Sequence, residues 1–349
     1  MSVSIEKLRT EAEATGFRVD VLAKVVRLLS VLRSVRDHPF LNGRLALKGG
    51  TALNLFVFDV PRLSVDIDLN YVGAGSRDGM LEERPRVEQA LTAVFSRENL
   101  SVRRAPEEHA GGKWRLRYQN PSGRSGTLEV DVNYMYRVPL WPIGTMDSCR
   151  LGSWGVRRVP VVDFHELVAG KLCALLSRNR ARDLYDSRLA LSLGIPGARF
   201  DAPGEVVNHD PCHGLLDPEL LRIAFVVYGA AARRDWRTVS IEDVRFEPRE
   251  LAGQLLPALR RRPVWRVGEA AEYGRRLVDD CRNLLSAVLP LREREVAFLD
   301  LLLDRGIVDG SILTGDAGLA KRIRAQPLLR WKARKVRSDR GRSPAIEGS

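Results

Sequence analysis

The sequence has few cysteines and no long apolar run. Its four cysteines, Cys149, Cys173, Cys212 and Cys281, show none of the paired short spacings of a zinc site or a disulfide framework, so we expect buried or incidental thiols. No stretch of about 18 consecutive apolar residues is present, as a membrane-spanning helix would need. The first ten residues also lack a basic segment followed by an apolar one. We therefore expect no membrane partner and a cytoplasmic location.

The length and composition favour more than one domain. A chain of 349 residues with 44% apolar content can bury a substantial core and suggests two domains rather than one. We predict a first domain with a helical lead-in over residues 1–195, a mostly helical domain over residues 196–320 and a basic tail over residues 321–349. A stretch rich in Gly, Pro and Asp, from residue 194 to about residue 214, is the predicted linker.

The positive charge is concentrated near the end of the chain. The net charge is +12, and residues 321–342 hold ten Lys or Arg residues against one Asp. Such a run attracts polyanions, and Trp331 within it could stack on a base. A solvated, partly disordered terminus is an equally simple interpretation of the same residues.

Hydrophobic periodicity predicts an α+β fold. Apolar residues at helical spacing predict a helical lead-in over residues 5–37, a helix starting at Thr51, and further helices from residue 162 onward. Short β-prone runs predict strands at residues 44–48, 65–72, 101–104, 114–118 and 127–137. Together these elements indicate a small mixed sheet flanked by helices, followed by a mostly helical C-terminal region.

Two aspartates on one predicted strand indicate a metal site. Alternation places Asp66 and Asp68 on the same face, where two like charges about 7 Å apart repel each other unless a cation joins them. Carboxylate oxygens are ligands that Mg²⁺ prefers. The same alternation around Asp131 predicts a third carboxylate on a neighbouring strand, and three acids can bracket two metal ions. The structural alternative is a solvated acidic face.

A glycine turn precedes the acidic strand. Gly49 and Gly50 lie between a predicted strand and the helix that starts at Thr51, where glycines let backbone amides approach a phosphate. Taken alone, Gly-Gly-Thr is a weak signal, and the neighbouring Lys48 could be an ordinary surface lysine. Followed by the acidic strand, the turn predicts a phosphate site beside a metal site.

A third segment supplies cations. Lys171 lies among apolar residues of a predicted helix and could hold a triphosphate oxygen or protonate the leaving pyrophosphate. If the helix continues, Arg178 and Arg182 share its face. Asp183 and Asp186, three residues apart on the next helix, could orient these cations. Ordinary surface ion pairs are the structural alternative.

In these three blocks, residues 47–56, 62–71 and 166–186, the chain resembles the AbiEii/AbiGii (MenT-like) nucleotidyltransferase toxins of the DNA polymerase β-like superfamily. The resemblance covers roughly residues 20–195. It implies a toxin of a toxin-antitoxin or abortive-infection system that acts in phage defence and is neutralised by a cognate antitoxin protein. It also implies transfer of a nucleoside monophosphate from an NTP to RNA, with Mg²⁺ as cofactor, tRNA 3′ ends as acceptor and pyrophosphate as the leaving group.

The resemblance also implies roles for single residues. Gly50 and Thr51, with Gly49, would bind the phosphates, and Asp66 and Asp68 would hold the metal. Lys171 and Asp183 would complete the site. Ser64 matches a position at which some relatives are silenced by phosphorylation, and a phosphate there would repel the incoming triphosphate.

Two other functions remain open from the sequence. The chain could transfer a nucleotide to a small molecule or a protein, although a small acceptor needs no long basic segment. It could also be a non-catalytic nucleic-acid-binding protein with a degenerate transferase fold, which the intact pair of aspartates argues against. Residues 200–349 carry no recognisable motif, so the acceptor is expected from the resemblance alone.

Overall fold

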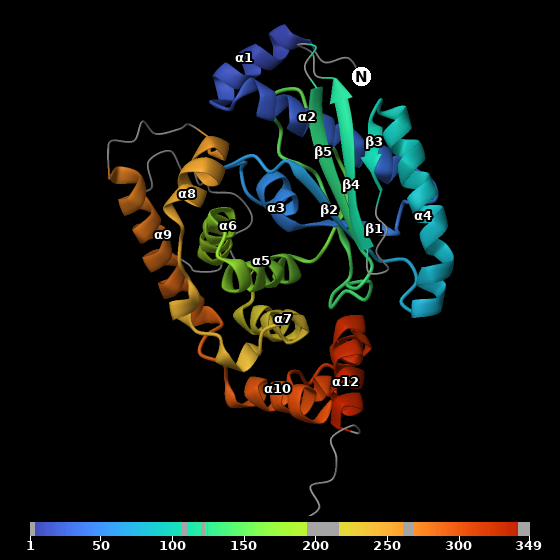
Figure 1. The fold of residues 1–349 in the computed structure, drawn as a ribbon, viewed down its shortest axis with the longest axis vertical. Helices are drawn as coiled ribbons and strands as arrows, with labels where there is room; N and C mark the ends of the chain where they lie inside the picture. Colours follow the sequence, from blue (N-terminus) through green and yellow to red (C-terminus); the bar gives the residue numbers. More distant parts are fainter. Residues whose placement is uncertain are drawn as a thin grey trace, which may run out of the picture.

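A seven-stranded mixed sheet forms the N-terminal half of the protein (Figure 1). The structure is a computed structural model that describes residues 4–105, 111–119, 123, 125–193, 216–260 and 268–340. The strand order is β3-β4-β5-β2-β1-β7-β6, with β2–β5 and β1–β7 parallel and the other neighbours antiparallel. The strands are β1 (Leu45–Lys48), β2 (Asp66–Tyr71), β3 (Ser101–Arg104), β4 (Gly111–Gln119), β5 (Ser125–Asn133), β6 (Gly144–Met146) and β7 (Val159–Val161).

Helices pack on the sheet because its strands alternate apolar and polar residues. On β4, Trp114, Leu116 and Tyr118 are buried, and the Trp114 ring makes an edge contact with Phe95 of α4. The helices of this half are α1 (Ile5–Thr15), α2 (Val19–Asp37), α3 (Gly49–Ala52), α4 (Arg77–Arg97), α5 (Phe164–Arg178) and α6 (Ala181–Ser192), with a π-helix η1 (Leu53–Val57) directly after α3. Figure 1 shows α2 crossing behind β4 and β5.

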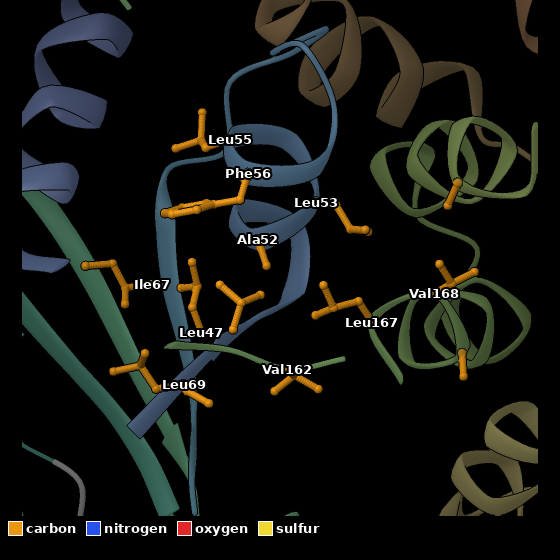
Figure 2. Close-up of a cluster of buried hydrophobic side chains, with 14 of the residues drawn as sticks. Leu47, Ala52, Leu53, Leu55, Phe56, Ile67, Leu69, Val162, Leu167 and Val168 are labelled. Atoms are coloured by element: carbon orange, nitrogen blue, oxygen red, sulfur yellow. The ribbon is translucent and has the colours of Figure 1, made fainter. Parts of the chain in front are cut away.

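A buried apolar cluster fixes α3 and η1 between the sheet and α5. Figure 2 shows Leu47 of β1 and Ile67 of β2 on one side of this helical turn and Leu167 of α5 on the other. Ala52 and Phe56 fill the space between them, and both are almost completely buried. The glycine turn at the start of α3 is therefore held by packing from both sides.

The C-terminal half is helical. Its helices are α7 (Pro218–Ala231), α8 (Pro248–Glu250), α9 (Glu269–Leu284), α10 (Glu293–Arg305), α11 (Ala317–Ala325) and α12 (Pro327–Arg340). Shorter segments are η2 (Trp236–Thr238), η3 (Ile241–Asp243), η4 (Leu251–Leu255), η5 (Leu256–Ala258), η6 (Leu285–Ala287) and η7 (Gly310–Ile312). In this half α7 packs against α5, and α9 packs against α6. The predicted linker lies outside the described residues, and the division of the chain near residue 195 stays a prediction.

The basic segment near the end of the chain is mostly helical. Residues 321–340, which the sequence analysis assigned to a basic tail, continue α11 and form α12, and Ile323, Leu329 and Ala333 are buried. Arg322 Nε donates to the carbonyl of Leu140 at 2.6 Å. The apolar residues between the cations give these helices an inner face, so residues 321–340 are part of the packed structure.

The predicted α+β architecture is confirmed, with shifts at the ends of elements. The lead-in is two helices, α1 and α2, and the predicted strands are present with boundaries moved by up to four residues. The helix predicted to start at Thr51 starts at Gly49 and widens into a π-helix after Ala52. None of the helices described between residues 4 and 340 is long and apolar enough to cross a membrane.

Candidate active site

The turn from β1 into α3 brings Gly49 against Asp68. Gly49 has a φ of +75°, a left-handed conformation that glycine adopts without steric cost. A Cβ added at this position would lie 2.6 Å from Asp68 Oδ2. The strand register agrees, since Lys48 lies directly opposite Asp68. The predicted glycine turn and the predicted acidic strand therefore form one site.

The three predicted metal-binding carboxylates occupy neighbouring positions of two parallel strands. Asp68 of β2 is paired with Asp131 of β5, and Asp66 is paired with Glu129. Burial raises the pKa of Asp66 and of Asp131 above that of an ordinary aspartate, and the charge of Asp68 raises both further. Lys24 Nζ, 4.0 Å from Asp66 Oδ1, opposes this shift at Asp66. Two carboxylates are thus held where their negative charge is unfavourable.

This donor set suits a hard divalent cation. Among the described residues, no three or more His, Cys, Asp or Glu side chains lie close enough together to form a group that could hold a metal ion. Mg²⁺ does not need such a group, because it binds through one or two carboxylates and keeps water and substrate phosphates in its other positions. A cation beside Asp66, Asp68 and Asp131 would also favour their charged forms and offset the raised pKa values of Asp66 and Asp131.

A buried network of ion pairs forms a second part of the site. Asp186 accepts from Arg62 Nε at 2.7 Å and lies 3.0 Å from Lys171 Nζ. Lys171 Nζ also donates to Asp183 Oδ1 at 2.9 Å, and Asp183 Oδ2 accepts from Arg178 Nε at 2.7 Å. Burial alone would raise the pKa of Asp186, but the charges of Arg62 and Lys171 lower it to about 2. The network carries three cations and two acids, so it retains one positive charge.

Asn54 connects this network to the glycine turn. Its Nδ2 donates to the carbonyl of Gly50 at 2.9 Å and to Asp186 Oδ1 at 3.0 Å. A Cβ added at Gly50 would lie 3.0 Å from Arg62 Nη2 and 3.1 Å from Ser64 Oγ. Glycine at this position therefore lets the turn approach the guanidinium and the serine hydroxyl closely.

The network and the start of the acidic strand open into a polar pocket of about 370 Å³. It is lined by Gly50, Arg62, Ser64, Asp66, Lys171, Arg178, Arg180, Arg182, Asp183, Glu250 and Gln254. Arg180 forms an ion pair with Glu250, whereas Arg182 has no ion pair or hydrogen bond with any residue that the structure describes. Five cations against three acids give the lining a positive potential that favours an anionic ligand.

The structure separates the predicted site residues into three groups. Gly50, Ser64, Asp66, Lys171 and Asp183 line the pocket. Gly49, Asp68 and Asp131 lie beside it on the turn and the sheet. Thr51 is fully buried, and its hydroxyl donates to the backbone carbonyl of Asp66. Its side chain thus anchors the acidic strand to α3.

Several residues of the site were missed by the sequence analysis. Arg62 and Asn54 are buried polar residues whose partner, Asp186, lies far along the chain. The only signals for them were a charged residue directly after Pro61 and an asparagine within an apolar run. No sequence signal marked Lys24, Glu250 or Gln254, because single polar residues in amphipathic helices are common.

Comparison with known proteins gives two findings. The family described as "Nucleotidyl transferase AbiEii toxin, Type IV TA system" matches residues 30–269, which include the glycine turn, the acidic strands and the ion-pair network. Among solved structures, the chain is similar to MenT4, a nucleotidyltransferase toxin from Mycobacterium tuberculosis. That match has 15% identity and a TM-score of 0.55, and it covers 97% of this chain and 99% of the other. No curated protein sequence matches the chain significantly.

Proposed function

The chain belongs to the AbiEii family of nucleotidyltransferase toxins of type IV toxin-antitoxin systems, and on this premise we propose that it transfers a nucleoside monophosphate from an NTP to RNA. The proposed acceptor is the 3′ end of a tRNA, the cofactor is Mg²⁺ and the leaving group is pyrophosphate. The family implies an NTP substrate and an antitoxin partner. We further propose that the enzyme acts in the cytoplasm, as part of a defence against phage.

The proposal rests on one observation: a pocket lined mainly by cations is also lined by the first residue of a strand that bears two carboxylates. Asp66 lines the pocket together with Lys171 and Arg182, and Asp68 follows on the same strand. A nucleoside triphosphate has a strongly anionic tail and needs a metal ion at the phosphate that reacts. The pocket volume of about 370 Å³ lies within the range of small-molecule sites.

Asp66, Asp68 and Asp131 are the residues that would hold Mg²⁺. The bound ion would supply Lewis-acid polarisation of the reacting phosphate and lower the pKa of an attacking hydroxyl. The strand pairing of Asp68 with Asp131 fixes the backbone positions of these two carboxylates.

The cations of the network would bind and orient the triphosphate. Lys171 is held between Asp183 and Asp186, with only 9% of its side chain exposed, so its ammonium group has little freedom to move. Fixed charges aimed at developing negative charge lower a barrier more than mobile ones, because they need no reorganisation during the reaction. We propose that Lys171 faces the departing pyrophosphate and that Asp183 acts as its positioning residue.

Transfer of radiolabel tests this function. The purified chain is incubated with α-labelled NTPs, Mg²⁺ and total tRNA, and the products are separated on a denaturing gel. We expect labelled RNA with the wild-type chain, and none with Asp66→Asn or when EDTA is added. RNA labelling that persists in Asp66→Asn would contradict the assignment of the site.

The labelled products of the same reaction, together with a separate binding assay, distinguish the other two functions. Label found in protein or in a small product, with RNA unlabelled, would favour a small-molecule or protein acceptor. Binding of RNA without metal-dependent binding of any NTP would favour a non-catalytic nucleic-acid-binding protein. Four separate reactions, each with one labelled NTP, identify the nucleotide used.

A further inference from the structure

On the face of the sheet that bears the carboxylates of the site, a row of cations lies next to them. The register pairs Asp131 of β5 with Lys113 of β4, and Glu129 with Arg115. Arg115 is in turn paired with Arg104 of β3. Because directly paired residues project from the same face of a sheet, these side chains share the face that bears the carboxylates.

This face of β4 is exposed and carries only cations at its charged positions. Lys113, Arg115 and Arg117 alternate along the strand, and 60% of the Lys113 side chain and 59% of the Arg115 side chain are exposed. The intervening residues Trp114 and Leu116 are buried on the side of α4. The cations therefore point away from the helix-covered face. We call the set Arg104, Lys113, Arg115 and Arg117 the basic sheet face.

Among the residues that the structure describes, acids neutralise this face only in part. Lys113 and Arg115 share a single carboxylate, Glu129, at 3.3 Å and 3.1 Å. Arg117 donates to the hydroxyl of Ser125 at 2.7 Å, which carries no charge. Arg104 lies directly opposite Arg115, and like charges in directly paired positions destabilise a sheet. An anionic ligand would relieve this repulsion.

We infer that the basic sheet face binds the sugar-phosphate backbone of the acceptor RNA and directs its end to the carboxylates of β2 and β5. The inference rests on the proposed function, in which RNA is the acceptor. Contacts from Lys and Arg to phosphates position a nucleic acid without reading its sequence. Of these cations, Lys113 lies nearest to the site, because it is paired with Asp131. Arg117 lies farther along β4.

A charge-removal variant tests this surface. The full-length chain is titrated against 5′-fluorescein-labelled total tRNA without NTP, and fluorescence anisotropy is followed at several salt concentrations. The variant Arg115→Gln/Arg117→Gln is expected to bind at least about tenfold more weakly, with a slope of log K against log[salt] that is smaller by about two. The KM for tRNA should rise while the KM for NTP stays unchanged.

Two variants with the same change in charge serve as controls. Arg275→Gln/Arg276→Gln alters two exposed arginines of α9, and Arg334→Gln/Lys335→Gln alters two exposed cations of α12. Both should bind tRNA like the wild-type chain. All three variants should remain folded in thermal unfolding, because the replaced side chains are on the surface.

The outcomes separate this inference from the proposed function. If the wild-type chain binds tRNA and Arg115→Gln/Arg117→Gln binds equally well, the inference is overturned and the proposed function stands. Weakening that is confined to the α12 variant would place the RNA on α12 and likewise overturn it. If the wild-type chain neither binds nor labels RNA, both proposals fail.

Discussion

Gly49 and Asp68 are in direct contact across the turn between β1 and α3, with no room for a side chain between them. A Cβ at position 49 would lie 2.6 Å from Asp68 Oδ2. Gly43 provides a natural comparison, because its φ of +76° is almost the same as the +75° of Gly49, yet an added Cβ there would meet nothing within 4 Å. The two glycines have the same backbone conformation and differ in their distance from the site.

Gly49→Ala is expected to abolish activity by moving the Asp68 carboxylate. The left-handed conformation costs a non-glycine residue about 1–3 kcal/mol, so stability should fall by that amount in both Gly49→Ala and Gly43→Ala. Urea unfolding measures this cost. Only Gly49→Ala should also lose nucleotide transfer, by about 100-fold or more. Equal activity of the two variants would mean that the contact with Asp68 has no role in catalysis.

Asp66→Asn should lose activity without losing stability. Burial raises the pKa of Asp66, which means that its negative charge is unfavourable in the folded chain without a metal ion. Removing that charge should leave the melting temperature of the metal-free protein unchanged or higher, while transfer falls by at least about 100-fold. Asp78→Asn is the matched control, because 96% of the Asp78 side chain is exposed. A large drop in melting temperature for Asp66→Asn would contradict this reasoning.

Asp186→Ala should destabilise the fold strongly. The substitution leaves the guanidinium of Arg62, which is 2% exposed, without its carboxylate, and removing one partner of a buried ion pair costs about 3–5 kcal/mol. Urea unfolding measures the loss. Asp20→Ala removes the partner of Arg18 at the surface, where 57% of the Asp20 side chain is exposed. That control should change stability by less than about 1 kcal/mol.

The ion pair between Arg62 and Asp186 also predicts how the stability of the fold depends on pH. The pKa of Asp186 is about 2 in the folded chain, against 3.8 for an ordinary aspartate. A carboxyl group with a lowered pKa makes its full contribution to stability when the pH is above its ordinary pKa. It loses this contribution as the pH falls through its pKa in the folded chain. The stability advantage of the wild type over Asp186→Asn should therefore shrink between about pH 4 and pH 2. A difference that stays constant over this range would contradict the assigned charge state.

For Glu166 we predict that the contribution to stability changes with pH in the opposite direction. Burial raises its pKa from 4.5 to about 8, although hydrogen bonds from the Leu140 amide and the Tyr228 hydroxyl oppose the shift. Below this raised pKa the carboxyl group of the folded chain binds a proton, so its contribution to stability is full below pH 4.5 and is lost as the pH rises through about 8. Glu166→Gln should therefore gain melting temperature relative to the wild type between pH 5 and pH 8. Glu6→Gln, at an exposed position of α1, should show no such gain.

The parts of the site that could be predicted from sequence are those built on local periodicity. Alternation along β2 was enough to place Asp66 and Asp68 on one face, and the glycines before Thr51 marked the turn. Both signals lie within one strand or one turn, where backbone geometry fixes the direction of side chains. Asp131 was also expected on a strand next to that of Asp66 and Asp68, but the parallel pairing of Asp68 with Asp131 and its register came from the structure.

The ion-pair network could be predicted only in part, because Asp183 and Asp186 were expected to orient Lys171 and Arg178, whereas Arg62 was not expected to join them. Arg62 and Asp186 are 124 residues apart, and nothing in either local pattern specifies the other. The same is true of Lys24, which lies on the amphipathic helix α2 with its Nζ 4.0 Å from Asp66 Oδ1. Residues 321–340 show a related limit, because their many charged residues obscured the pattern of the few apolar residues that pack them against the fold.

The pairing of Arg62 with Asp186 also has a consequence during synthesis of the protein. The ribosome makes the arginine and the acidic strand early, and the carboxylate that neutralises the arginine only 124 residues later. A nascent chain, or one released prematurely before residue 186, has no buried partner for Arg62 and no assembled pocket. The complete pocket of this toxin therefore forms only after more than half of the polypeptide has been made, since Glu250 and Gln254 also line it.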